Sequence, residues 1–331
     1  MDDAALYFTG PRTVETRPIH VPSPDRGEVR VETRVSAISA GTELLVYRDE
    51  APADLVADET IDALEGDLSY PTAYGYAAVG EVVDTGPGVD EAWRGRTVFS
   101  FVPHQTRFTT RPDALVPVPE TLEPTAAALL PAVETATNLV LDANPRLGER
   151  VVVFGAGVIG LCAIGLLGSF PLERLVVVEP LESRRELALA FGADRAVPPG
   201  DIGTVVDDAD LAIELSGDPR ALDDAIGTVG YDSRVVVGSW YGTKRAPLEL
   251  GGRYHRDRIE LRSSQVSTID PTLRGRWDTD RRLETALEWL GRLDVDSLIT
   301  DRVPFREADA AYERLDTSPE STLQVLLTYD T

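Results

Sequence analysis

Three closely spaced glycines, Gly155, Gly157 and Gly160, could bind the phosphates of a nucleotide. They follow the apolar run 151–154 and lead into the apolar stretch 161–167, which predicts a buried strand, a tight turn and a helix. In such a turn the second glycine lets the backbone approach a pyrophosphate, and the helix N-terminus presents N–H groups to it. The expected phosphate-binding residues are Gly155, Gly157, Val158, Ile159 and Gly160.

A carboxylate stands where a second strand is expected to end. Glu179 closes the apolar run 175–178 and lies 24 residues after Gly155, close to the spacing of a group that binds the adenosine ribose hydroxyls. A carboxylate there repels a 2′-phosphate, so NAD(H) is the preferred cofactor. Arg184, shortly after it, could reverse that preference in favour of NADP(H), or could be one of the solvated charges of the next helix.

The elements that must position these residues form a repeating pattern. Two further apolar runs, 211–215 and 234–238, end in small residues, and with the first two runs they predict a doubly wound parallel sheet over residues 123–270. Residues 1–122 contain short β-like runs separated by proline and glycine, which predicts a β-rich domain. The pattern then changes and predicts one helix over residues 125–142. Residues 271–331 contain too few apolar positions for a core of their own, so we expect them to complete that first domain.

Composition restricts the environment and the partners. The chain has 56 acidic and 32 basic residues, a net charge of −24, and one lysine. This surface repels nucleic acid and anionic membranes, and its acidity predicts a halophilic protein. The start of the chain has no signal-peptide pattern and no apolar run is long enough to span a bilayer, so a cytoplasmic protein is expected. A single cysteine, Cys162, excludes a cysteine-rich zinc site.

The order of domains resembles the medium-chain dehydrogenase/reductase superfamily, which includes the zinc-type alcohol dehydrogenases. The segments that carry the resemblance are 38–43, 70–80, 147–160 and 303–312. The sequences of segments 38–43 and 261–265 are similar to those of bacteriochlorophyllide a dehydrogenase-like members. The resemblance implies an α/β protein with a GroES-like β-rich catalytic domain, 1–122 and 271–331, and a Rossmann cofactor domain, 123–270. It also implies a homodimer formed through the sheet edge of the cofactor domain.

The chain departs from the superfamily at the positions of its zinc ligands. The cysteine position falls on Ser39 or Ala40, and the histidine and glutamate positions fall on Tyr76 and Ala77. Hydroxyl and methyl groups bind zinc poorly, so no metal is expected at this site or at the superfamily's structural-zinc site.

Without zinc, a side chain must protonate the substrate oxygen. Tyr76 can donate through its phenol or pack in the β domain, and Thr42 can orient the substrate or stabilise a turn. His104 is the candidate with a near-neutral pKa, with His255 as a competitor. Glu134 can act as a base or pair with an arginine.

The expected function is hydride transfer between a nicotinamide and a small alcohol or ketone in the cleft between domains, without zinc. One alternative is an NADPH-dependent enone or quinone reductase, and another is an inactive nucleotide-binding regulatory protein. The resemblance also implies further cofactor contacts, from Ser216, Gly238, Ser239, Trp240 and Ser263.

Overall fold

The computed structural model describes residues 3–58, 60, 61, 63, 64 and 66–329. The chain forms two compact units: Met1–Pro131 together with Val295–Thr331, and Ala132–Asp294. The expected boundaries, after residues 122 and 270, lie earlier in the chain than these.

The first unit is built on a seven-stranded sheet. Its strand order is β14-β15-β3-β4-β5-β7, and β6 pairs with β3. The strands are β3 (Val29–Ala37), β4 (Ala78–Thr85), β5 (Thr97–Ser100), β6 (Arg107–Thr110), β7 (Val116–Pro117), β14 (Ile299–Pro304) and β15 (Gln324–Thr328). The C-terminal strand β15 pairs antiparallel with β3, as expected for a segment that lacks its own core.

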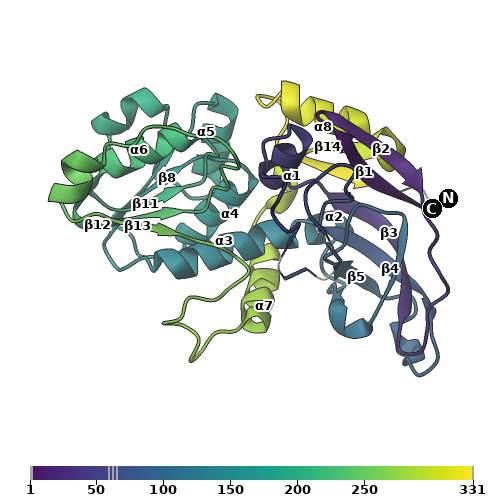
Figure 1. Ribbon diagram of the computed structural model, residues 1–331. Coiled ribbons are helices and arrows are strands. Elements are labelled where there is room, and N and C mark those ends of the chain that lie inside the picture. The colour runs from purple at the N-terminus through teal and green to yellow at the C-terminus, as the bar shows by residue number, and fades with distance from the viewer. Residues whose placement is uncertain (1–2, 59, 62, 65, 330–331) are drawn as a thin grey trace. The chain divides into compact units, whose positions relative to one another are not determined.

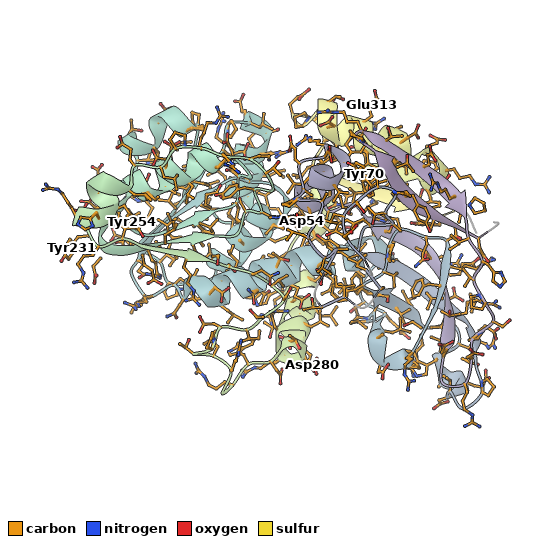
Figure 2. The ribbon with its side chains drawn as sticks, in the orientation of Figure 1. Asp54, Tyr70, Tyr231, Tyr254, Asp280 and Glu313 are labelled. Carbon is orange, nitrogen blue, oxygen red and sulfur yellow. The ribbon has the colours of Figure 1, made fainter. Side chains whose placement is uncertain are left out.

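Short elements surround this sheet. They are the paired strands β1 (Ala4–Gly10) and β2 (Thr13–Pro18), the helices α1 (Ala40–Tyr47), α2 (Pro124–Ala127) and α8 (Ala308–Thr317), and the 3-10 turns Glu91–Trp93, Pro112–Ala114, Val295–Leu298 and Phe305–Glu307. Tyr47 of α1 stacks on Tyr312 of α8, with ring centroids 5.5 Å apart. Tyr70, labelled in Figure 2, donates a hydrogen bond to the carbonyl of Val46 and so ties the irregular segment before β4 to α1.

The second unit contains a six-stranded parallel sheet in the order β10-β9-β8-β11-β12-β13. The strands are β8 (Arg150–Phe154), β9 (Arg174–Val178), β10 (Arg195–Val197), β11 (Ala209–Glu214), β12 (Val229–Val237) and β13 (Glu260–Ser263). The helices are α3 (Leu130–Ala143), α4 (Val158–Leu167), α5 (Glu182–Ala190), α6 (Pro219–Thr228) and α7 (Thr279–Leu290), with a 3-10 turn at Pro199–Thr204 and a π turn at Leu250–Tyr254.

Helices cover both faces of this parallel sheet, as its apolar strands require. Leu222 and Ile226 of α6 pack on Val152 and Val235 of the sheet. Figure 1 shows α6 along one side of the sheet and α3 along the other. The β-rich unit and the doubly wound unit confirm the predicted fold class.

Two sequence expectations change. The helix expected over 125–142 divides into α2 and α3, because Pro131 lacks the N–H that a continuous helix needs and is tolerated in the first turn of a new one. Helix α7 was expected in the first domain but belongs to the second unit, where Arg282 forms a buried ion pair with Glu134 of α3.

Candidate active site and cofactor-binding turn

Three hydroxyl groups meet at the N-terminus of α1. The Tyr76 phenol donates to Ser39 Oγ at 2.6 Å and lies 3.3 Å from Thr42 Oγ1. Ser39 is the residue that precedes α1, Thr42 lies in its first turn, and Tyr76 comes just before β4. We call Ser39, Thr42 and Tyr76 the hydroxyl trio. The trio forms because β3 and β4 pair antiparallel, with Ser36 opposite Ala78, so Tyr76 before β4 lies close to Ser39 after β3.

The hydroxyl trio suits proton transfer. All three residues are half-buried, so they retain access to solvent. Burial raises the pKa of Tyr76 above its ordinary value of 10.0, while the hydrogen bonds to Ser39 and Thr42 act in the opposite direction. The phenol is therefore protonated at neutral pH and available as a donor. The positive end of the α1 dipole favours negative charge developing beside it.

His104 does not belong to this exposed group. It was expected as the acid or base with a near-neutral pKa, but its side chain is 0 % exposed. Its Nδ1 lies 2.7 Å from Ser36 Oγ and its Nε2 lies 3.1 Å from Glu43 Oε2, so both ring nitrogens are occupied. A fully enclosed imidazole cannot reach a substrate. The competitor, His255, is exposed in the second unit.

Glu134 likewise has a buried partner. Arg282 donates to Glu134 Oε1 at 2.8 Å through Nη2 and at 3.1 Å through Nε, and to Asn138 Oδ1 at 2.9 Å. Burial raises the pKa of Glu134, and the charge of Arg282 partly opposes this. Of the two roles considered for Glu134, this geometry favours pairing with an arginine over acting as a base.

The glycine turn has the local geometry that a phosphate-binding turn needs. Gly155 adopts φ +97°, and a Cβ there would lie 2.8 Å from the Leu215 carbonyl. A Cβ on Gly160 would lie 2.2 Å from the Gly155 carbonyl oxygen, so this glycine lets α4 pack against the turn. Gly157 differs, because a Cβ on it would meet nothing within 4 Å. Its missing side chain leaves open space at the start of α4, beside Val158 and Ile159.

Glu179 lies directly beside this turn. Its Oε2 accepts from the N–H of Ala156 at 2.8 Å and its Oε1 accepts from the N–H of Leu181 at 3.0 Å. The side chain is only 4 % exposed, so the carboxylate is fixed by the backbone at the end of β9. Each oxygen retains a second lone pair for a ribose hydroxyl.

The two arginines that follow Glu179 in α5 are not freely solvated. Arg185 donates to the carbonyl oxygens of Glu179 and Pro180, at 2.8 Å and 2.7 Å. Arg184 is half-buried; burial lowers its pKa and the charge of Glu179 opposes that effect.

The carboxyl ends of β11 and β12 bring other expected cofactor contacts together. Ser239 Oγ accepts from the N–H of Gly217 at 2.9 Å, and Ser216 N–H donates to Glu214 Oε1 at 2.7 Å. Gly238 follows β12 without space for a side chain, since a Cβ would lie 2.7 Å from Leu215. Trp240 is half-buried beyond it. Ser263 is exposed at the end of β13.

Sequence reasoning missed a buried carboxylate in this group. Glu214 is 0 % exposed and accepts from the Tyr241 phenol as well as from Ser216. Lys244, the only lysine of the sequence, donates to the Gly217 carbonyl at 3.0 Å. The position of Glu214 at the end of an apolar run, like that of Glu179, was the available signal.

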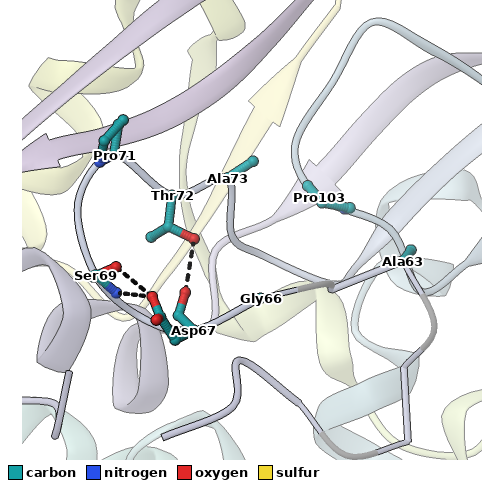
Figure 3. Close-up of a pocket in the computed structure, with 8 residues that line it drawn as sticks. All are labelled: Ala63, Gly66, Asp67, Ser69, Pro71, Thr72, Ala73 and Pro103. Carbon is teal, nitrogen blue, oxygen red and sulfur yellow. Dashed lines mark hydrogen bonds between the residues drawn. The ribbon is translucent and has the colours of Figure 1, made fainter. Parts of the chain in front are cut away.

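A separate hollow of about 470 Å³ lies in the first unit (Figure 3). It is lined by Ala63, Gly66, Asp67, Ser69, Pro71, Thr72, Ala73 and Pro103. The Asp67 carboxylate accepts from the N–H and hydroxyl of Ser69, and Thr72 Oγ1 donates to the Asp67 carbonyl. No member of the hydroxyl trio is among the described residues that line this hollow, and the carboxylate of Asp67 is hydrogen-bonded within the loop.

Within the described parts of the chain, no three His, Cys, Asp or Glu side chains converge as metal ligands. Cys162 is buried in α4, where burial raises the pKa of its thiol to about 12. None of the helices among the described residues is long and apolar enough to cross a membrane.

The chain is similar in sequence and in fold to several dehydrogenases. No family model matches the chain. It is 26 % identical over 325 residues to D-guloside 3-dehydrogenase of Escherichia coli K12, covering 91 % of this chain and 93 % of that one. It is 26 % identical over 334 residues to L-threonine 3-dehydrogenase of Thermococcus kodakarensis, covering 89 % of each.

A solved structure, described as a short chain alcohol dehydrogenase from E. coli CFT073 complexed with NADH, superposes with a TM-score of 0.77. It shares 19 % identity and covers 98 % of this chain and 99 % of that chain. The solved structure confirms the expected fold. The relatives confirm the expected class of enzyme, an NAD(P)-dependent oxidoreductase acting on alcohols.

Proposed function

We propose that this protein is a zinc-independent dehydrogenase that interconverts a small secondary alcohol and its ketone with NAD(H). The observation that carries the proposal is the hydroxyl trio, in which the Tyr76 phenol occupies the position expected for a zinc-ligand histidine. The relatives named for D-guloside and L-threonine support a small, hydrogen-bonding alcohol as the substrate.

The cofactor is held by the second unit. The open space at Gly157 and the adjoining N–H groups of Val158 and Ile159 suit a pyrophosphate, and Glu179 suits the ribose hydroxyls. Gly238 and Ser239 follow β12, at the carboxyl end of the same parallel sheet. When bound, the nicotinamide supplies the hydride for ketone reduction or accepts it in alcohol oxidation.

The first unit supplies the proton. In reduction, the Tyr76 phenol gives its proton to the substrate oxygen as negative charge develops there. For this transfer the phenol O–H turns from Ser39 Oγ to the substrate oxygen. The hydroxyl groups of Ser39 and Thr42 then donate hydrogen bonds to the phenolate, which regains a proton from solvent. In oxidation the same phenol oxygen must first be deprotonated to accept the alcohol proton.

The proposal assigns no step to zinc. At the positions of the superfamily's zinc ligands the chain has the hydroxyl groups of Ser39 and Tyr76 and the methyl groups of Ala40 and Ala77, which are poor ligands for that ion. The test is to remove bound metal from the purified protein with EDTA, verify the removal by mass spectrometry, and assay NAD⁺ reduction with polyols and hydroxy acids. Full activity in metal-free protein is expected; activity that vanishes and returns only with zinc would overturn the proposal.

Cofactor preference is tested separately by titrating NADH and NADPH and following tryptophan quenching. Tighter binding of NADH is expected because Glu179 is fixed beside the turn and repels a 2′-phosphate. Tighter binding of NADPH would implicate Arg184 and favour the enone or quinone reductase.

We also propose a homodimer that forms through β13, one of the two edge strands of the parallel sheet. An exposed strand edge carries unpaired backbone groups that a second copy can bind. Light scattering in concentrated salt should give twice the chain mass of 35.9 kDa, and a monomeric mass would contradict this.

A further inference from the structure

A chain of buried polar side chains lies directly behind the hydroxyl trio. Glu43 Oε2 lies 3.1 Å from His104 Nε2 and also accepts from the Tyr312 phenol. His104 Nδ1 lies 2.7 Å from Ser36 Oγ, which lies 2.9 Å from the Tyr329 phenol. Since a carboxylate only accepts, His104 donates through Nε2 to Glu43. In the neutral imidazole Nδ1 is then the acceptor for the Ser36 hydroxyl.

Ser36, His104 and Glu43 have the connectivity of a Ser–His–Glu hydrolytic triad. They cannot work as one, because the side chains of all three are 0 % exposed and a nucleophile must reach its substrate. Neither Ser36 nor His104 lines the hollow found in this unit. This buried group can therefore affect a substrate only through the residues that it contacts.

Both ends of the His104–Glu43 pair contact the segments that carry the hydroxyl trio. Glu43 follows Thr42 in sequence, and its Oε1 accepts from the N–H of Ser39 at 2.6 Å. The imidazole of His104 packs on Gly75, where a Cβ would lie 2.5 Å from the ring, and Gly75 precedes Tyr76. One pair thus fixes the segment bearing Ser39 and Thr42 and the segment bearing Tyr76.

We propose that His104 and Glu43 are positioning residues that set the Tyr76–Ser39 hydrogen bond and so align the proton donor. This rests on the proposed function of the hydroxyl trio. Hydrogen bonds in a buried, satisfied network are rigid, so the pair can hold the half-buried trio in one geometry. Tyr312 and Ser36 complete the pair by occupying its remaining hydrogen-bonding positions.

The kinetic test compares His104→Ala, His104→Gln and Glu43→Gln, with Glu32→Gln as the control. Glu32 lies in the same unit and accepts from Arg107 at 2.6 Å, away from the trio. We expect kcat to fall about 10²-fold in His104→Ala and Glu43→Gln, with little change in KM or NADH affinity, because misplacement of a reacting group by about 1 Å has that effect. His104→Gln should recover part of the loss, since its amide N–H can replace Nε2–H toward Glu43.

A second readout does not depend on activity. In protein labelled with 3-fluorotyrosine, the Tyr76 and Tyr312 fluorine resonances can be assigned from Tyr76→Phe and Tyr312→Phe. The proposal expects Glu43→Gln and His104→Ala to shift the Tyr76 resonance, and Glu32→Gln to leave it unmoved. Should Glu43→Gln fail to fold, Tyr312→Phe, which removes one hydroxyl from the pair, is expected to shift the Tyr76 resonance instead.

The two readouts separate the two proposals. A Tyr312 resonance that moves in Glu43→Gln while the Tyr76 resonance stays in place would show that the pair only stabilises the core, and the inference would be wrong. Absence of hydride transfer in the wild-type protein would overturn the proposed function, and the fluorine spectra would still decide whether the pair positions Tyr76.

Discussion

The phenol oxygen of Tyr76 lies 2.6 Å from Ser39 Oγ, although the two residues are 37 positions apart in sequence. This contact places a protonated phenol at the start of α1. In the proposed function this phenol protonates the substrate oxygen, at a position where zinc-type members of the superfamily have a metal ligand.

Replacing Tyr76 with phenylalanine should remove the proton donor while preserving the ring. We expect kcat to fall about 10²- to 10⁴-fold, the usual contribution of general acid–base catalysis, with NADH affinity unchanged. Steady-state kinetics and a cofactor titration would check this. Tyr74→Phe is the matched control, because Tyr74 packs edge-on against Tyr76 but its hydroxyl faces the Ala57 carbonyl at 3.5 Å. Equal losses in both variants would count against a special role for Tyr76.

The two directions of the reaction should respond oppositely to pH. Burial raises the pKa of Tyr76 above 10.0, so ketone reduction should keep its protonated donor through neutral pH and lose it only in strongly alkaline solution. Alcohol oxidation needs the deprotonated phenol and should accelerate as pH rises. The pH profiles of kcat in both directions would test this, and an oxidation rate that levels off near pH 7 would point to a different base.

Alanine substitutions at two glycines of the turn should differ in their effects on stability and on NADH binding. Gly157→Ala meets no atom within 4 Å at a φ of −72°, so the melting temperature without cofactor should change little while NADH binding weakens. Gly155→Ala should instead lower the melting temperature, because its φ is +97° and its Cβ would lie 2.8 Å from the Leu215 carbonyl. Thermal melts with and without NADH distinguish the two, and unchanged NADH affinity in Gly157→Ala would place the phosphates elsewhere.

Removing Arg282 should leave Glu134 as an uncompensated buried charge. Burial already raises the pKa of Glu134, and Arg282→Met should raise it further. The folded variant then favours the protonated carboxyl, so its free energy of unfolding should fall as pH rises from the unfolded-state pKa near 4.5 to the folded-state pKa. Urea unfolding at pH 8 should show a loss of about 3–5 kcal/mol, with a smaller loss at pH 5.

The double variant Glu134→Gln with Arg282→Met is the control for this experiment. It has no titrating group at the site, so the extra pH dependence should disappear. If Arg282→Met alone lost the same stability at both pH values, the effect would come from packing instead of charge.

The net charge of −24 should make stability depend on salt. Screening length falls from about 10 Å at 0.1 M to about 3 Å at 1 M, so repulsion between surface carboxylates weakens. We expect the melting temperature to rise with KCl over this range. A constant melting temperature would contradict the prediction of a halophilic protein.

Sequence periodicity predicted the fold well because each signal was local. The turn at Gly155 and the strand that ends at Glu179 were expected in their correct order, and the doubly wound sheet followed from them. The same logic failed at residues 125–142, where one proline separated two helices. It also did not group α7 with the second unit, in which Arg282 of α7 pairs with Glu134.

The sequence by itself determined which residue types were available: a glycine turn with the spacing of phosphate-binding turns, an acidic surface, and a phenol and hydroxyls where zinc ligands would otherwise be expected. These depend on residue type and short-range spacing. Only the tertiary structure decided which candidates meet. It buried His104 against Glu43, 61 positions away, and it brought Tyr76 to Ser39, because strand pairing joins segments whose separation in sequence carries no information about their distance.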